Sequence, residues 1–582
     1  DYHAADIRNI AIAGHSGSGK TTRAEALIYK AGASDRLGKT AEGTTVCDYD
    51  PEEIKRKISL GTSLAYCQWK DVKINILDTP GQFDFAAGLY EGISAAESVV
   101  IALPAKDGVQ VGTIKAYREA IKHGKATMFV VTRMEEENSN FYKCLEELKT
   151  QFGPSICPIV VPFDKYGTVE SYINLLEMKA YTYDNGIPTE VPMPASENRL
   201  KGLRAAMAEA VGAETDEELM MRYFENEGED FTEAEIVKGL HDGIHKGYIT
   251  PVVCCSGDTL AGIDMMLNTI IYMLPSPDET GGELCDDGSK VQYASRDTLE
   301  AKVFKTVADP FVGKLSYIKI VNGTLAAGTE VVNRTTGNLE KPGKLLSMQG
   351  KKTEDMIEAY AGDIVAATKL SANTGDTLTA SGDETVFAAE KYPVPCFFKA
   401  ISAKDKNDEG KISNAIKRMV EEDKTLSYDH NHETHQRILG GLGEQHLDAA
   451  ISKMKAKFGV DVIVSDPIIA YRESIRKKVQ AEGKHKKQSG GHGQYGHVKI
   501  EFEPCDSDAL VFEEKVFGGS VPKNYFPAVE KGLVESTAHG VLAGYPVVNL
   551  KATLLDGSYH PVDSSEQAFK MAAHIAYKQG LA

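Results

Sequence analysis

A glycine-rich segment near the start of the chain has the residue types and the spacing that hold a phosphate chain. It fits G-x-x-x-x-G-K-[ST] at every fixed position and reads Gly14-His15-Ser16-Gly17-Ser18-Gly19-Lys20-Thr21, with Thr22 next. In such a loop the backbone N–H groups surround the β-phosphate, the Lys20 ammonium lies between the β- and γ-phosphates, and the Thr21 hydroxyl can ligate Mg²⁺. The segment predicts a nucleoside triphosphate site, and the alternative is a glycine-rich turn without a ligand.

A second polar segment follows an alternating apolar stretch at residues 72–77 and reads Asp78-Thr79-Pro80-Gly81. Open α/β sheets bind ligands at the carboxyl ends of their strands. A strand at 72–77, parallel to the one before the phosphate loop, would therefore bring Asp78 beside the Mg²⁺. Standing alone, the four residues would be typical of a turn.

The segments around these motifs predict a doubly wound α/β sheet. Residues 7–13 form a short apolar run before the phosphate loop, and residues 23–29 supply the helix after it. Further buried strands are expected at 98–103, 126–131 and, after a long insertion, 251–255. Strands that alternate with helices in this way build a parallel sheet covered on both faces.

Together these motifs resemble those of the translation elongation factor G family, and the chain resembles a divergent paralogue of it. Residues 52–60 resemble the end of switch I in that family, residues 78–85 resemble switch II, and residues 272–277 resemble the exit from the GTPase domain. The resemblance implies GTP and Mg²⁺ as ligands.

The resemblance also assigns roles to single residues. It implies that Thr21, Ser59 and Asp78 hold the metal and that the Gly81 N–H senses the γ-phosphate. The order of the two switches would then report the γ-phosphate. As a bare hydroxyl in a basic stretch, Ser59 would be an ordinary surface serine.

Two residues of the expected phosphate site depart from the family. Gly17 stands where the family has an aspartate, and Gln82 stands where it has the histidine that orients the attacking water. Glutamine does this task in Ras. We hypothesise that Gln82 positions the water, with Lys20 and Gly81 as the other catalytic groups.

The residues expected at the base differ more. Where the family has Asn-Lys-x-Asp, this chain reads Thr132-Arg133-Met134-Glu135. The Glu135 carboxylate could accept from the guanine N1–H and amine, Arg133 could stack on the base, and Thr132 could offer one hydrogen bond. Ser256-Gly257 resembles the fifth motif, whose backbone amides meet guanine O6. The alternative for residues 132–135 is a polar loop that starts a helix, so the strength of the guanine preference stays open.

The whole chain predicts a multidomain α/β and β protein. The resemblance divides it into a P-loop GTPase domain at 1–278 with an inserted subdomain at about 153–246, a β-barrel at 279–388, and two α+β domains at 389–475 and 476–582, without the family's fifth domain. Glycine-punctuated alternation at 296–380 also predicts the barrel, and residues 392–471 predict strand, helix, strand, helix, strand. The acidic run at 214–235 is either a solvated helix face or, by resemblance, a contact with the ribosomal stalk.

A basic stretch at residues 472–499 reverses the acidic sign of the chain. Its glycine loop at 488–497 offers amide, aromatic and imidazole groups, a combination that grips single-stranded or irregular RNA. With residues 556–566 it resembles the two tip loops of the family's fourth domain, which enters the ribosomal decoding region. The alternative is a solvated basic linker. The RNA-contacting candidates are Lys484, Lys486, Lys487, His492, Gln494, Tyr495 and His560.

Composition limits the class of protein. The 582 residues exceed the roughly 250 to 300 that one hydrophobic core supports, so several domains are expected. The nine cysteines include no C-x-x-C pair, and no run of about 18 apolar residues could span a membrane. A net charge of -19 argues against RNA binding over the whole surface. We expect a cytoplasmic monomer with reduced thiols.

The resemblance implies a ribosome-stimulated GTPase that couples hydrolysis to the movement of tRNA and mRNA. Its partners would be the ribosome, through rRNA and the stalk protein, and the tRNA–mRNA pair, with no membrane. Ribosome protection, recycling and a stress role share the same domains and stay open. So does a GTP-binding module that docks on ribosomes without hydrolysis. An ATP-using P-loop enzyme is disfavoured because the switch-like segments would then have no role.

Overall fold

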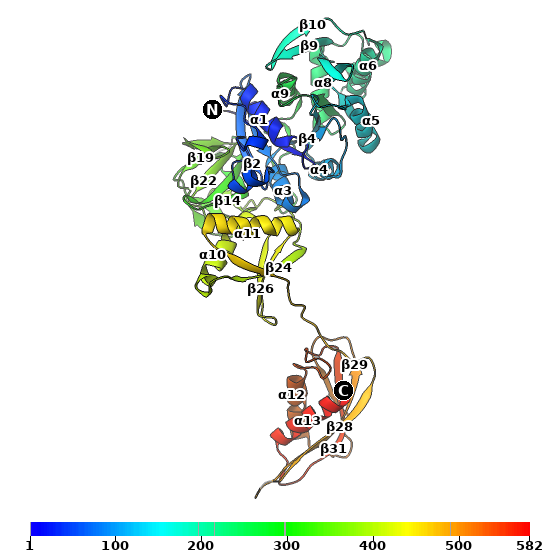
Figure 1. Cartoon of the computed structure of the whole chain (residues 1–582), viewed down its shortest axis with the longest axis vertical. Helices are drawn as coiled ribbons and strands as arrows, with labels where there is room; N and C mark the ends of the chain where they lie inside the picture. Colours follow the sequence, from blue (N-terminus) through cyan, green and yellow to red (C-terminus); the bar gives the residue numbers. More distant parts are fainter. Residues whose placement is uncertain (1, 196, 215, 296–297, 489) are drawn as a thin grey trace. The chain divides into compact units, whose positions relative to one another are not determined.

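The computed structural model describes the chain apart from residues 1, 196, 215, 296–297 and 489. Arg296, at the start of the predicted barrel, and Ser489, in the predicted glycine loop, lie outside the described residues. The chain forms two compact units, one of Asp1–His430 and Arg437–Asp466, the other of Asn431–Gln436 and Pro467–Ala582 (Figure 1). No helix among the described residues combines the length and apolar character needed to cross a membrane.

The first unit begins with the predicted parallel sheet. Its strand order is β2-β3-β1-β4-β5-β11-β6. The strands are β1 (Ile7–Gly14), β2 (Ser63–Trp69), β3 (Val72–Asp78), β4 (Ser98–Pro104), β5 (Ala126–Thr132), β6 (Ile156–Pro158) and β11 (Thr250–Cys254). All neighbours pair in parallel except β2, which is antiparallel to β3. The doubly wound α/β sheet is thus confirmed, and the carboxyl ends of β1 and β3 lie at the same edge.

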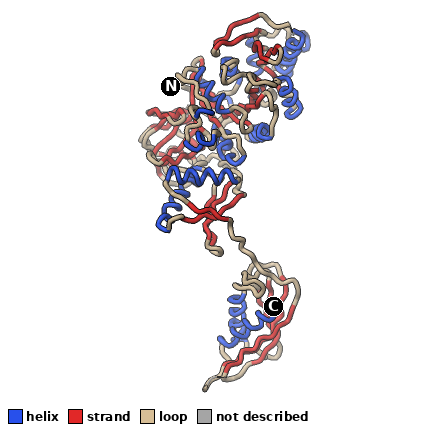
Figure 2. Tube along the Cα trace, in the orientation of Figure 1, coloured by secondary structure: helices blue, strands red, loops and turns tan. Residues whose placement is uncertain are grey.

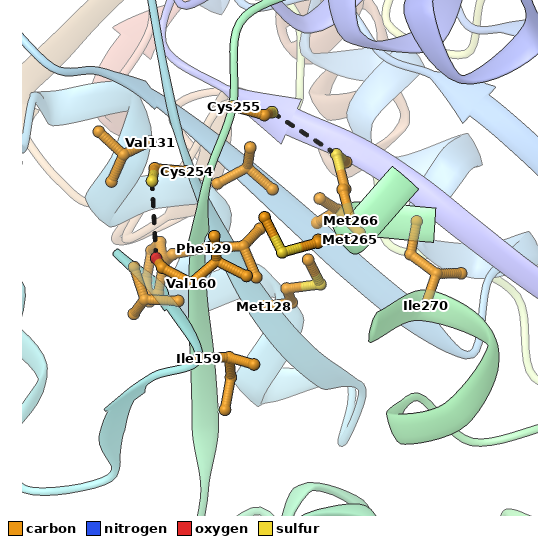
Figure 3. Close-up of a cluster of buried hydrophobic side chains, with 14 of the residues drawn as sticks. Met128, Phe129, Val131, Ile159, Val160, Cys254, Cys255, Met265, Met266 and Ile270 are labelled. Atoms are coloured by element: carbon orange, nitrogen blue, oxygen red, sulfur yellow. Dashed lines mark hydrogen bonds between the residues drawn. The ribbon is translucent and has the colours of Figure 1, made fainter. Parts of the chain in front are cut away.

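Helices cover both faces of this sheet, which explains its continuous apolar strands. They are α1 (Lys20–Lys30), α3 (Ala86–Ala95), α4 (Val111–Lys122), α5 (Phe141–Phe152) and α9 (Ile263–Met273), and the short α2 (Pro51–Arg56) precedes β2. Figure 3 shows part of the core, where β5, β11 and α9 meet around Phe129 and Met265. Cys254 and Cys255 are fully buried there, and burial raises the pKa of both thiols.

An insertion between α5 and β11 forms a smaller α/β layer. It contains an antiparallel sheet of order β10-β9-β8-β7 and three helices. Its elements are β7 (Val160–Lys165), β8 (Thr168–Asn174), β9 (Lys179–Asp184), β10 (Ile187–Val191), α6 (Glu197–Glu214), α7 (Glu217–Asn226) and α8 (Glu233–His245). The acidic run falls mainly on α7 and the start of α8, where Arg222 pairs with Glu235 and Asp230.

An eight-stranded sheet of order β18-β17-β23-β14-β15-β22-β19-β20 follows, as predicted for the β-rich segment. Its strands are β14 (Glu300–Asp309), β15 (Gly313–Asn322), β17 (Val331–Asn333), β18 (Leu339–Glu340), β19 (Leu345–Gln349), β20 (Lys352–Met356), β22 (Ile364–Thr368) and β23 (Thr377–Thr379). Two short sheets, β12 (Glu283–Leu284) with β13 (Lys290–Val291) and β16 (Thr324–Ala326) with β21 (Glu358–Tyr360), flank it.

The first unit ends in a four-stranded α+β layer of order β25-β26-β24-β27. Its elements are β24 (Phe397–Ala403), α10 (Glu409–Glu422), β25 (Ser427–Asn431), β26 (Gln436–Gly441), α11 (Glu444–Phe458) and β27 (Val462–Ser465). The prediction of three strands was wrong by one. Two strands, β25 and β26, stand between the helices because the chain turns back over residues 432–435.

The second unit carries two helices on one face of a sheet of order β28-β29-β31-β30 (Figure 2). Its elements are β28 (Val479–Lys487), β29 (Gln494–Pro504), β30 (Val511–Glu514), α12 (Phe526–Ser536), β31 (Leu550–Ser558) and α13 (Glu566–Leu581). Phe502 and Phe569 are fully buried between sheet and helices.

Candidate nucleotide site and basic tip

The phosphate loop connects the end of β1 to the start of α1. Gly14 adopts φ 145°, Gly17 φ 78° and Gly19 φ 85°, a region that side chains disfavour. A Cβ at Gly14 would lie 2.4 Å from the Ala102 carbonyl oxygen, so the loop needs a glycine at that position. No side chain caps α1, whose N-terminus is left to bind an anion.

Lys20 is buried at the centre of the loop. Its Nζ donates to the His15 carbonyl at 2.8 Å, and burial lowers the pKa of its ammonium to about 8. A Cβ at Gly81 would lie 2.3 Å from that Nζ and 2.7 Å from the Ser16 amide nitrogen. The segment after β3 therefore lies against the phosphate loop, and the three groups predicted to meet the phosphates are brought together.

Three side chains predicted at the metal also converge. The Thr21 hydroxyl donates to Asp78 Oδ2 at 2.7 Å and lies 3.0 Å from the Ser59 Oγ. The other carboxylate oxygen of Asp78, Oδ1, is buried and has no hydrogen-bond partner among the described residues. Burial, with the neighbouring Asp48, raises the pKa of Asp78 to about 7. A buried, unpaired carboxylate oxygen beside two hydroxyls is the donor set that Mg²⁺ prefers, so these residues fit the ion.

Asp48 belongs to the same cluster and was missed from the sequence. It is 4% exposed and accepts a hydrogen bond from Ser59 Oγ at 2.6 Å. Burial raises the pKa of its carboxyl, although the hydrogen bond from Ser59 opposes the shift. The one local signal is its place ahead of Asp50, which caps α2 through the Glu52 N–H at 2.9 Å. Helix α2 lies between Asp48 and Ser59 in the chain, and both side chains line the cavity beside the loop.

An open cavity of about 670 Å³, counted with the solvent at its mouth, lies over these groups. Gln82 lines it, is half-buried, and makes no side-chain hydrogen bond to another described residue. Its amide is therefore available to a water in the cavity. The lining residues are Ser16, Gly17, Gly19, Lys20, Thr21, Thr22, Thr40, Asp48, Lys57, Ile58, Ser59, Gly81, Gln82 and Arg133.

The residues predicted at the base are only partly assembled. Arg133 lines the cavity in a left-handed conformation, φ 58°, and pairs with Glu136 at 3.1 Å. The Thr132 hydroxyl is fully buried and donates to the Ser18 carbonyl at 2.7 Å, so it fixes the phosphate loop. Glu135 is exposed and does not line the cavity.

The loop after β11 is closed on itself. The Ser256 N–H donates to the Ala261 carbonyl at 2.9 Å. The Ser256 Oγ accepts from the Thr259 N–H at 3.2 Å. Neither Ser256 nor Gly257 is among the residues that line the cavity. Of the five residues predicted at the base, Arg133 alone lines it.

In the second unit, the two predicted tip loops lie together. The Gly493 N–H donates to Asp563 Oδ1 at 3.2 Å, and the Tyr495 N–H donates to the Asp563 carbonyl at 2.9 Å. His560 Nδ1 accepts from the N–H groups of Val562 at 3.2 Å and Asp563 at 3.0 Å. Because backbone N–H groups can only donate, the proton of a neutral His560 ring is on Nε2, which the exposed side chain can offer to a ligand.

The basic candidates border these loops. Lys484, Lys486 and Lys487 are exposed on β28, and the Lys484 Nζ lies 5.7 Å from the centre of the Tyr495 ring. Lys487 pairs in register with Gln494 on β29. His492 and Gln494 are also exposed. All seven RNA-contacting candidates therefore occur at one end of the sheet or in the loops beside it.

Comparisons with known proteins cover almost the entire chain. Residues 5–276 match the elongation factor Tu GTP binding domain, residues 298–381 elongation factor G domain 2, residues 392–466 its domain III, and residues 467–582 its domain IV. A crystal structure of a protein from Thermus thermophilus is similar, with a TM-score of 0.85 and 36% sequence identity over 99% of this chain and 84% of that chain.

Proposed function

We propose, from the premise that this chain belongs to the elongation factor G family of translational GTPases, that it binds GTP with Mg²⁺ and hydrolyses it under stimulation by the ribosome. The observation that carries the proposal is the cluster of Thr21, Ser59 and Asp78, with the unpaired Asp78 Oδ1, directly beside Lys20. This arrangement matches the chemistry of a Mg²⁺–triphosphate complex.

Different residues of the chain bind the phosphates, orient the water and hold the metal. The phosphate-loop N–H groups and the Lys20 ammonium hold the phosphates, and the Gly81 N–H lies where it can meet the γ-phosphate. Gln82 orients the attacking water through its amide. When bound, Mg²⁺ supplies neutralisation of the phosphate charge, and Thr21, Ser59 and Asp78 would hold it, with Asp48 positioning Ser59.

The second unit supports the family's part in translocation. Its clamped tip loops present the His560 Nε2–H and three exposed lysines, groups suited to RNA backbone and unstacked bases. We propose that this end meets the tRNA–mRNA pair in the decoding region, that the domain limits are those expected from the sequence, and that the protein acts as a cytoplasmic monomer.

Steady-state hydrolysis of GTP and of ATP, each with and without ribosomes, tests the proposal. We expect strong ribosome stimulation with GTP alone. Lys20→Ala should abolish it, whereas Lys246→Ala, an exposed lysine of the inserted layer, should not change it. Binding of GTP without hydrolysis under any condition would instead support a docking module, and equal turnover of ATP would contradict the proposal.

A further inference from the structure

A second open cavity lies between the parallel sheet and the inserted layer. Its volume is about 1720 Å³, counted with the solvent at its mouth, and it shares no lining residue with the nucleotide cavity. Helices α8 and α9, the turn after β8 and Arg8 of β1 contribute to its walls. Ile159, Val160 and Met265 line it with buried apolar side chains. A concave apolar surface with a few polar groups is typical of a small-molecule site.

Arg8 is the buried charged residue of this lining, and it is 8% exposed. Its Nη1 donates to the carbonyls of Ala5 and Ile7, and its Nη2 donates to the Ile271 carbonyl, each at 2.9 Å. A guanidinium has five N–H groups, so at least two of them, the Nε–H included, have no acceptor among the described residues. All three acceptors are neutral carbonyls. Burial lowers the pKa of Arg8, although Glu279 opposes the shift from beyond hydrogen-bond distance. Arg8 therefore keeps a buried charge and spare donors, which an oxyanion would satisfy.

Two further cations line the same cavity at its exposed side. Lys70 and Lys238 are exposed, and neither forms an ion pair within the described part of the chain. The Lys70 Nζ lies 5.5 Å from the centre of the Tyr272 ring, which also lines the cavity. Glu177 and Glu233 are the acidic lining residues, and both are exposed. Solvent screens exposed charges much more than buried ones, so the buried guanidinium dominates the recognition of charge.

We propose that this cavity is a binding site for a small organic anion, with a carboxylate or phosphate head at Arg8 and an apolar body against the buried side chains of α9 and the sheet. Carboxylates and phosphates both present two oxygens at the spacing of adjacent guanidinium N–H groups. Lys70 and Lys238 would attract the anion to the mouth. The site is independent of the proposed GTP binding, because the two cavities have no residue in common.

The chain carries its own reporter for this site. Trp69 is the single tryptophan of the sequence, and its Nε1 donates to Asn268 Oδ1 at 2.9 Å. Asn268 lines the cavity, so a bound ligand should change the emission of Trp69. Equilibrium dialysis measures binding that leaves the emission unchanged.

Phenylbutyrate, phenylbutyl phosphate and the neutral phenylbutanol share one apolar body and differ in the head group. Titrated into the full chain with excess GDP and Mg²⁺, at least one of the two anions should bind about tenfold or more tightly than the alcohol, the scale of one hydrogen bond to a charged group. The tighter anion identifies the preferred head. Equal affinity for all three probes would overturn the recognition of an anion, and absence of binding by all three would overturn the site.

Variants separate the charge of Arg8 from the shape of the cavity. Arg8→Met should remove the advantage of the anions and leave the affinity for phenylbutanol unchanged. Lys70→Gln combined with Lys238→Gln keeps the buried contacts of Arg8 and should weaken the anions about threefold, the scale of exposed charge pairs. This double variant tests charge recognition even if Arg8→Met lowers thermal stability. An unchanged preference for anions in a folded Arg8→Met, or in the double variant, would overturn the inference.

A substitution that narrows the cavity tests its location. Ala234 is exposed on α8 and lines the cavity, so Ala234→Phe should weaken all three probes without lowering thermal stability. Ala206→Phe, at an exposed alanine of α6 outside the lining, is the matched control and should bind the probes as the wild type does. Equal binding by these two variants would place the probes elsewhere on the protein and overturn the site, whatever the outcome of the GTP hydrolysis measurements.

Discussion

The carboxylate of Asp84, in the segment that follows β3, accepts a hydrogen bond from the backbone N–H of His446 at 3.1 Å. His446 lies in the first turn of α11, whose own N-cap, Gly443, has no side chain to offer. A Cβ at Gly443 would lie 2.4 Å from an Asp84 oxygen. The GTPase domain thus supplies the N-terminal cap of α11 in the α+β layer. When Asp84 is ordered, this hydrogen bond stabilises α11 in its observed position.

Replacing Asp84 with alanine should lower the free energy of unfolding by about 1 kcal/mol, the usual effect of removing an N-cap. Asp84→Asn should lose less, because the amide oxygen still accepts the hydrogen bond. Urea unfolding followed by circular dichroism measures both. Asp35→Ala, at an exposed aspartate of the same domain, serves as the control and should have little effect. Equal stabilities of Asp84→Ala and the control would show that the cap is unimportant.

Gln82→Ala should reduce ribosome-stimulated kcat for GTP by about a hundredfold, because orienting and polarising the attacking water contributes on that scale. KM for GTP should hardly change, since Gln82 makes no contact needed to hold the phosphates. Gln82→His, which restores the family's side chain, should keep substantial turnover. Full turnover by Gln82→Ala would exclude a role for the glutamine.

Buried ion pairs join the GTPase domain to the eight-stranded sheet. Lys319 pairs with Glu97, and both are nearly or fully buried. Burial lowers the pKa of Lys319, while Glu97 opposes the shift. Lys319→Met leaves Glu97 without its partner and should cost about 3 to 5 kcal/mol in thermal or urea unfolding. The double variant Lys319→Met with Glu97→Gln should recover much of that loss, because no charge then stays buried alone; failure to recover would assign the cost to packing.

Local motifs explain why the centre of the site could be predicted. The phosphate loop and the residues after β3 are contiguous segments, and the parallel register of β1 with β3, pairing Ile12 with Asp78, brings them together as expected. The α+β layer has a similarly local arrangement at His446, which is buried and whose Nε2 lies 2.7 Å from Asp423 Oδ2.

The rest of the site depends on contacts between distant segments. Asp48 meets Ser59 across α2, and its place two residues before the helix cap Asp50 does not show that contact. Thr132 has the hydroxyl expected of it, but the partner of that hydroxyl is set by the packing of β5 against the phosphate loop.

The pair of His241 and Glu279 should make stability depend on pH. The hydrogen bond that His241 donates to Glu279 raises the pKa of His241, although burial opposes it. Burial alone would raise the pKa of Glu279, but hydrogen bonds from His241 and Ser276 outweigh it and hold that pKa at about 2. The histidine's contribution is therefore complete below its unfolded pKa of about 6.5 and is lost as the pH rises through its raised folded value.

His241→Gln should accordingly reduce the free energy of unfolding at pH 6 by about 0.5 to 1 kcal/mol and have a smaller effect at pH 9. Unfolding curves at both pH values provide the measurement. Glu279→Gln should remove the pH dependence that involves His241. A His241→Gln effect of the same size at both pH values would indicate lost packing instead of a lost charge pair.

The basic end of the second unit should bind RNA through exposed lysines and not through every lysine of the stretch. Lys484, Lys486 and Lys487 are exposed, whereas the Lys478 Nζ lies 3.0 Å from a Glu501 oxygen and 3.2 Å from a Glu503 oxygen. Counterion release makes log K fall with log salt by roughly 0.7 per neutralised phosphate on a single strand. Replacing the three exposed lysines with alanine should therefore weaken binding of a single-stranded RNA and reduce that slope by up to about 2.

Lys478→Ala is the matched control, since its charge is already paired and its loss should leave the slope unchanged. Fluorescence anisotropy with a labelled RNA at several salt concentrations gives affinity and slope together. His560→Ala, in contrast, should weaken binding without reducing the slope, because Nδ1 accepts backbone hydrogen bonds and the side chain is expected to contribute one hydrogen bond from Nε2. If Lys478→Ala and the triple variant changed the slope by the same amount per lysine, RNA would be drawn to the general charge of the stretch, and the clamped tip would have no special part in binding.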